Sequence, residues 1–131
     1  MTKPPDPPAG LMAVGPREWM NVWVRVIASP SVKLVGAMAA HFADYSDGAS
    51  IHPGNAVLAA VSGGMNTRTV LLALAQMREW GLIWRYQEGS KQGRRGLADV
   101  YRLTIPQDAI GRVPMLDPEY RQPRVPVDNP P

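Results

Sequence analysis

The sequence contains no cysteine and only two histidines, His41 and His52, among its 131 residues. The absence of cysteine excludes disulfides, thiolate zinc sites and cysteine nucleophiles. The two histidines do not form a short metal-ligand motif. We therefore expect neither a metal site nor a cofactor, and no small-molecule ligand is evident from the sequence.

Long apolar runs are also missing. No stretch reaches the roughly eighteen consecutive apolar residues typical of a membrane span. The first ten residues, MTKPPDPPAG, lack the apolar stretch of a signal peptide. These features predict a cytoplasmic protein that does not enter a membrane.

Both ends of the chain have few large apolar residues and many prolines. Four prolines fall within the first ten residues, and seven lie between Pro106 and Pro131. Proline removes a backbone donor, and too little apolar surface remains to offset the entropy of ordering. We therefore expect disordered tails at residues 1–15 and 107–131, around one ordered domain at residues 16–106.

Positive charge is unevenly distributed. Between Asn66 and Arg102 the chain has seven basic and three acidic residues, an excess of four positive charges (7 − 3), whereas three of each balance between Pro16 and Met65. Such a local excess indicates a polyanionic partner. A solvated basic surface is the alternative explanation at this point.

The first half of the ordered region reads as two helices. Residues 16–28 start at Pro16 and carry apolar residues at helical spacing, although VWVRV also alternates as a strand does. Residues 29–45 form a clearer helix, with Ser29 as cap and Pro30 at its first position. Its expected apolar stripe comprises Leu34, Val35, Met38, Phe42 and Tyr45.

The second half reads as a short strand at Ile51, two helices and a hairpin. Gly54 or Asn55 begins a short helix, SGG turns the chain, and Asn66 caps a helix that Gly81 ends. The alternating stretches LIWRYQ and DVYRLTI then predict a β-hairpin. Its tip, EGSKQGRRGLA, is basic and rich in glycine.

This order of elements resembles the winged helix-turn-helix domain, in the version found in phage, plasmid and integrative-element proteins, including replication initiators and small regulators. The matching residues are SPSVKLVGAMAAHFADYSDG, HPGNAVLAAVSG, NTRTVLLALAQMREWGLI and YRLTIP. The resemblance implies an α+β, mainly α fold with a C-terminal β-hairpin wing. It also implies double-stranded DNA as the partner and no enzymatic activity, with a role in transcription regulation or replication initiation.

Two segments are the candidate DNA contacts. A helix fits the major groove of DNA with its N-terminal residues at the base edges. In this helix the residues at that end are Asn66, Thr67, Arg68 and Thr69. Arg68 can grip a guanine through two hydrogen bonds, and Leu72 can contact a thymine methyl group. In the hairpin tip, the flanking glycines let the chain approach phosphates at Lys91, Arg94 and Arg95.

A second reading of the same helix is a protein-interaction module. Relatives commonly carry polar or basic residues where this chain has Leu71 and Leu72. An apolar face there can pack on a partner protein instead of lying in a groove. The basic hairpin tip favours DNA, and the two leucines favour the protein partner.

We also expect a homodimer, because operator binding by a small domain usually requires two copies on a symmetric site. Trp19, Trp23 and Ile27 carry more apolar surface than a short covering helix requires, so they are the predicted dimer contact. Catalysis has little support. Asp44 and Asp47 flank a helix end, where capping or turn formation is their commoner role, and Ser62 has no nearby base.

Overall fold

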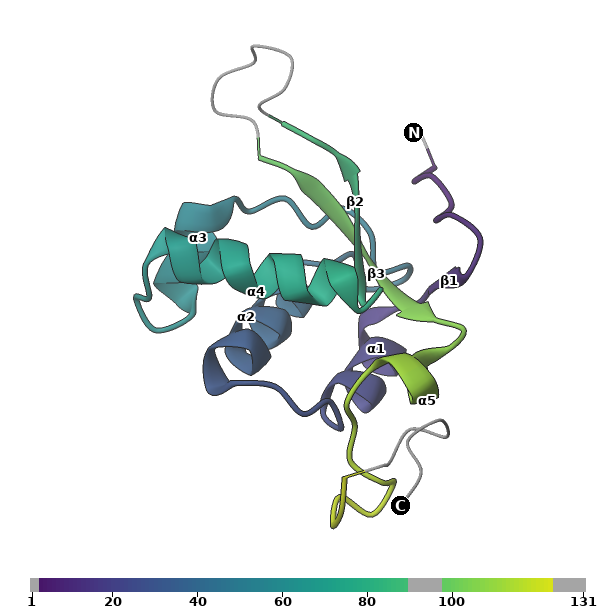
Figure 1. Cartoon of the computed structure of the whole chain (residues 1–131). Coiled ribbons are helices and arrows are strands. Elements are labelled where there is room, and N and C mark those ends of the chain that lie inside the picture. The colour runs from purple at the N-terminus through teal and green to yellow at the C-terminus, as the bar shows by residue number, and fades with distance from the viewer. Residues whose placement is uncertain (1–2, 90–97, 124–131) are drawn as a thin grey trace.

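The computed structural model describes residues 3–89 and 98–123. In this part of the chain, helices and an antiparallel sheet of three strands form an α+β fold (Figure 1), as the sequence predicts. The elements in chain order are β1 (Leu11–Ala13), α1 (Pro16–Trp23), α2 (Pro30–His41), α3 (Asn55–Val61), α4 (Thr67–Glu79), β2 (Ile83–Gln87), β3 (Val100–Pro106) and α5 (Ala109–Arg112).

The β2–β3 hairpin is confirmed. Its strands pair antiparallel with Ile83 opposite Leu103, and the register shifts between Arg85 and Gln87. Ile51 forms an isolated bridge to Tyr101, with backbone N–H···O distances of 3.0 and 2.9 Å. The short strand expected at Ile51 is thus a single bridge on β3. The connecting residues 90–97, which include Lys91, Arg94 and Arg95, lie outside the described part.

Helix ends follow the predicted local chemistry. Ser29 Oγ accepts from the backbone N–H of Val32 at 3.3 Å, which caps α2 before Pro30. Gly54 precedes α3, and Gly81 follows α4 at φ +77°, the left-handed backbone that glycine adopts without strain. The chain can therefore turn directly from α4 into β2.

Helix α1 is shorter than predicted. It ends at Trp23, so the alternating stretch after it is neither helix nor strand except for a bridge between Val26 and Met115. Lys33 stabilises this end: its ammonium donates to the carbonyl oxygens of Trp23 and Val26, the latter at 2.9 Å. A cation at a helix C-terminus satisfies carbonyls that have no helical partner. Burial lowers the pKa of Lys33.

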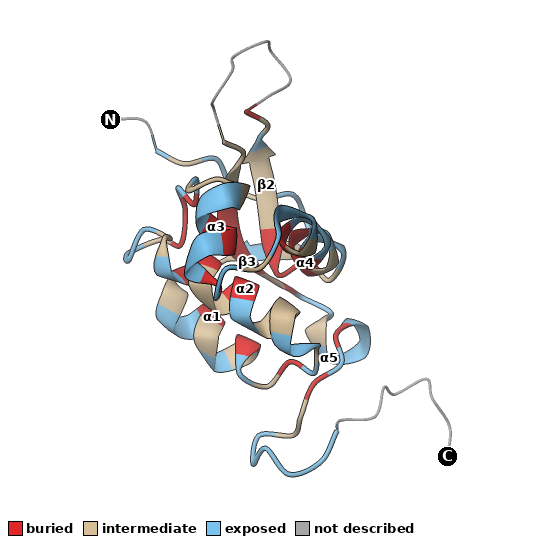
Figure 2. Ribbon diagram, turned by 90° about the vertical axis from the view of Figure 1, so that its left-hand side faces the viewer, coloured by how far each residue is buried: buried red, intermediate tan, exposed pale blue. Residues whose placement is uncertain are grey.

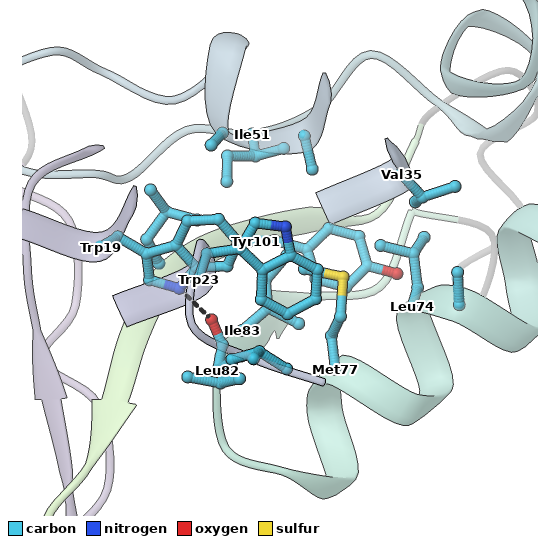
Figure 3. Packing of buried hydrophobic residues seen from close by; sticks show 14 of the residues in the cluster. Trp19, Trp23, Val35, Ile51, Leu74, Met77, Leu82, Ile83 and Tyr101 are labelled. Atoms are coloured by element: carbon cyan, nitrogen blue, oxygen red, sulfur yellow. Dashed lines mark hydrogen bonds between the residues drawn. The ribbon is translucent and has the colours of Figure 1, made fainter. Parts of the chain in front are cut away.

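The core is built around two stacked tryptophans. The ring centroids of Trp19 and Trp23 lie 4.9 Å apart, and both side chains are buried. Figure 3 shows them beside Ile51, Met77 and Tyr101, with the Trp19 indole N–H directed at the Leu82 carbonyl oxygen. Figure 2 shows α1 to α4 with buried residues facing one another and exposed residues outside.

The apolar stripe predicted for α2 is partly wrong. Tyr45 lies beyond the helix and is 84% exposed, and Leu34 is also exposed. The buried face uses small residues instead, namely Gly36, Ala39 and Ala40 beside Val35. Small side chains let α2 approach the tryptophans of α1 closely, and a pattern of large apolar residues does not reveal such a face.

The predicted domain boundaries at residues 16 and 106 are too narrow. Before residue 16, β1 pairs with β3, Leu11 lying opposite Pro106, and Arg102 Nη1 donates to the Pro5 carbonyl oxygen at 2.7 Å. After residue 106 the chain forms α5 and buries two apolar side chains, Val113 and Met115. The described parts of both tails, residues 3–15 and 107–123, therefore belong to the fold. They find backbone partners on β3 and beside α1, which a composition argument does not anticipate.

Candidate nucleic-acid interface

The start of α4 is fixed by Asn66. Its side-chain oxygen accepts from the backbone N–H and from the hydroxyl of Thr69, both at 2.9 Å. The predicted cap is confirmed. These bonds engage the Asn66 oxygen and the Thr69 hydroxyl hydrogen, so both side chains hold the helix start in place. Thr67 and Arg68 are exposed, as Asn66 is, and make no capping contact.

Arg68 is free to contact a ligand. Its side chain is exposed, and it makes no hydrogen bond or ion pair with any residue in the described part of the chain. Because the Asn66 cap fixes the first turn, the guanidinium is carried on a rigid element. The contact residue predicted to read a base is thus placed where a ligand can reach it.

The two faces of α4 differ completely in burial. One face packs into the core through Val70, Ala73, Leu74 and Met77. The opposite face exposes Leu72 by 60%, together with Ala75, and Leu71, exposed by 53%, lies between the two faces. Large apolar side chains exposed side by side on one helix indicate a contact surface.

Leu71 and Leu72 nevertheless lie in different surroundings. A hollow of about 790 Å³ lies between the N-terminal end of α3, α4 and the loop end of the hairpin strands, and Leu71 lines it. We call this end of the strands, residues 85–89 and 98–101, the hairpin base. His52, Asn55, Leu58, Gln87 and Asp99 also line this hollow. Leu72 is not among its lining residues. Leu71 therefore faces the hairpin side, whereas Leu72 shares the outward face with Arg68, four residues earlier.

The hairpin base carries an ion-pair network that sequence reasoning missed. The guanidinium of Arg85 lies 2.9 Å from a Glu88 carboxylate oxygen and 3.4 Å from one of Asp99. Asp99 also accepts from the backbone N–H of Gly89 at 2.9 Å. The i,i+3 spacing of Arg85 and Glu88 gave a hint, but Asp99 comes from the other strand. Arg85 is therefore engaged in holding the hairpin base.

Acidic residues are absent from the segment that forms α3 and most of α4. Residues 48–78 contain no Asp or Glu, whereas Arg68 and Arg78 lie within this range. Both Arg68 and Arg78 are exposed. The next residue, Glu79, is exposed and ends α4 on the face that carries Arg68 and Leu72. The part of this surface that has no carboxylate to repel a polyanion is therefore the part around Arg68 and Leu72.

The predicted dimer contact through Trp19 and Trp23 is wrong. Both indoles are buried in the chain's own core, and their N–H groups donate to the carbonyl oxygens of Leu82 (2.7 Å) and Lys33 (3.0 Å). The excess apolar surface seen in the sequence is covered by α2 and the α4–β2 junction. Of the three predicted residues, Ile27 alone is exposed, by 39%.

Two further groups have shifted acidities. Burial, and then the neighbouring Asp99 carboxylate, raise the pKa of Tyr101, so its phenol stays neutral at physiological pH. Hydrogen bonds from the Ser46 hydroxyl and backbone lower the pKa of Asp44, which supports the turn-forming role expected for it. Within residues 3–89 and 98–123, no three His, Asp or Glu side chains form a group able to hold a metal ion.

In the same two ranges, no helix is long and apolar enough to cross a membrane. Comparisons of the chain with protein-family models, with curated proteins and with solved structures found no match.

Proposed function

We propose that this chain is a double-stranded DNA-binding protein built on a winged helix-turn-helix. In this assignment α3 and α4 form the helix-turn-helix, α4 enters the major groove, and the β2–β3 hairpin is the wing. The order α2, bridge at Ile51, α3, α4, β2, β3 supports it. A transcription regulator or the DNA-binding part of a mobile-element replication system would use such a domain.

The observation that carries this proposal is the outward face of α4. It presents Arg68, without a partner in the described part, within a stretch of 31 residues (48–78) that has no carboxylate, and the first carboxylate on this face is Glu79 at the end of α4. The hairpin beside it is joined by a segment that carries three basic residues, Lys91, Arg94 and Arg95. In this arrangement α4 would contact the bases, which gives specificity, and the basic hairpin segment would contact the phosphates, which positions the protein on the duplex.

Arg68→Ala should lose sequence discrimination. We expect a loss of about 1–3 kcal/mol on the preferred duplex and little change on a random one, since base contacts specify and phosphate contacts do not. Fluorescence anisotropy with both duplexes measures this. The charge-matched control is Arg17→Ala, an exposed arginine on α1. Equal losses on the two duplexes would make Arg68 a phosphate contact and move base reading elsewhere.

A second candidate function is a winged-helix protein-interaction module. The exposure of Leu71 and Leu72 favours it, because apolar side chains exposed on one helix can form part of a protein contact surface. This function predicts that Leu71→Ala with Leu72→Ala abolishes partner binding while the Arg68 variant keeps it. The lack of carboxylates in residues 48–78 has no role in that account, so we place it second.

A homodimer on a symmetric site remains part of the proposal. One module offers an interface on the order of 600–1,000 Å², so tight binding calls for a second copy. Because Trp19 and Trp23 are buried, Ile27 is the one residue of the predicted dimer contact that is exposed and could meet a second copy.

A further inference from the structure

The outward face of α4 has an apolar side chain where a base-reading helix usually carries hydrogen-bonding groups. Leu72 is 60% exposed, and Ala75 lies one turn beyond it on the same face. Neither side chain can donate or accept a hydrogen bond. If this face lies in a major groove, as the proposed function states, its apolar part must contact an apolar group there.

The base edges of the major groove display one apolar group, the C5 methyl of thymine. 5-Methylcytosine carries the same methyl group at the same ring position. Apart from ring C–H groups, the other groups at the edges are donors or acceptors, and an apolar side chain placed against those would leave them unpaired. Methylated pyrimidines are therefore the bases that Leu72 fits.

The spacing of Arg68 and Leu72 sets where such a pyrimidine lies. The two residues are four positions apart, which separates them by about 6 Å along the helix axis at 1.5 Å per residue. Successive bases of one strand are separated by about 3.4 Å. A guanine held by Arg68 and a methyl group touching Leu72 thus belong to base pairs one or two steps apart. The small Ala75 side chain lets the helix approach closely.

We propose that α4 reads the C5 methyl group of a pyrimidine through Leu72, one or two base pairs from a guanine bound by Arg68. This inference rests on the proposed function and names what the site recognises. The charge around Arg68 and Leu72 supports DNA as the occupant, because residues 48–78 have no carboxylate to repel phosphates and Glu79, on the same face, lies about two turns beyond Leu72.

The test uses the full chain and a duplex selected from a randomised pool. Each thymidine of the selected site is replaced in turn by deoxyuridine, which lacks the methyl group, and each deoxycytidine by 5-methyldeoxycytidine. One deoxyuridine should weaken binding about fourfold, the loss expected for one buried methyl group. If methylation of a cytosine strengthens binding by a similar factor, Leu72 recognises the methyl group of 5-methylcytosine. If only the deoxyuridine replacements change binding, it recognises the methyl group of thymine.

Variants assign the effect to Leu72. The Leu72→Ala variant should bind thymidine and deoxyuridine duplexes equally. The control variant Leu34→Ala changes an exposed leucine on α2 and should keep the roughly fourfold preference for the thymidine duplex. Equal binding of all methylated and unmethylated duplexes by the unaltered chain would overturn the inference and leave DNA binding intact. If the Leu72→Ala variant kept the preference for methylated over unmethylated duplexes, the role of Leu72 would be overturned. No binding to any duplex would overturn the proposed function, and the inference with it.

Discussion

Trp19→Ala should destabilise the chain by about 3–5 kcal/mol, the usual cost of truncating a buried tryptophan. The indole is fully buried, stacks on Trp23 at 4.9 Å and donates to the Leu82 carbonyl oxygen at 2.7 Å. Truncation leaves a cavity and also leaves that buried carbonyl without its donor. Because small domains are stable by about 5–15 kcal/mol, the loss is a large share of the total.

Urea unfolding monitored by circular dichroism measures this loss. Trp84→Ala is the matched control, since Trp84 lies on β2 and is only partly buried, and we expect a clearly smaller loss for it. Leu82 follows Gly81 at the junction of α4 and β2, so Trp19 also fixes the direction in which the hairpin leaves the helix. If Trp19→Ala kept its stability and changed only the oligomeric state, the tryptophan would be a subunit contact after all.

Gly36→Ala should also destabilise the chain, although alanine is the better helix former. A Cβ at position 36 would lie 2.3 Å from Cζ2 of Trp23. The Trp23 ring cannot move freely, because Trp19 stacks on it and because its indole N–H donates to the backbone carbonyl oxygen of Lys33 at 3.0 Å. We expect a net loss of about 1–3 kcal/mol, the cost of overpacking, which outweighs the helix-propensity gain of about 1 kcal/mol.

The control for this prediction is Gly111→Ala in α5, where an added Cβ meets nothing within 4 Å. That variant should be neutral or more stable by up to about 1 kcal/mol. Thermal unfolding of the two variants beside the unaltered chain compares them. Equal stability of Gly36→Ala and the unaltered chain would mean that α1 and α2 pack less closely than described.

Local signals in the sequence predicted where α2, α3 and α4 begin and where α4 ends. Asn66 and Ser29 cap their helices, and Gly81 ends α4, because each effect depends on residues within one turn. The hairpin was found from its alternation, which has a period of two. Such features require no knowledge of distant parts of the chain.

Features that depend on distant partners were not predicted. Residues 11–13 are ordered by pairing with β3, and the end of α1 is held by Lys33, which donates to the carbonyl oxygens of Trp23 and Val26. The burial of Trp19 depends on Leu82, which lies 63 positions away in the sequence. Composition identified both indoles as apolar surface but could not say which surface covers them. The assignment of Trp19 and Trp23 to a dimer contact was wrong for that reason.

The candidate site divides in the same way. Arg68 and Leu72 were predicted from helical periodicity and lie on the exposed face as expected. The separation of Leu71 from Leu72 was not predicted, because the hollow beside Leu71 is formed by α3 and the hairpin base. Lys91, Arg94 and Arg95 lie outside the described residues, so their role stays a prediction.

The salt dependence of duplex binding tests the central claim most directly. We predict that the chain binds random-sequence duplex DNA at low salt, and that the logarithm of its affinity falls linearly with the logarithm of salt concentration. Arg94→Ala with Arg95→Ala should reduce the magnitude of that slope by about 2, because each arginine that neutralises a phosphate adds about one unit to it. The control Arg17→Ala with Arg121→Ala removes the same charge from exposed positions elsewhere and should leave the slope unchanged. Failure to bind any duplex at low salt would contradict the account, and an unchanged slope in the Arg94 and Arg95 variant would remove the hairpin from the interface.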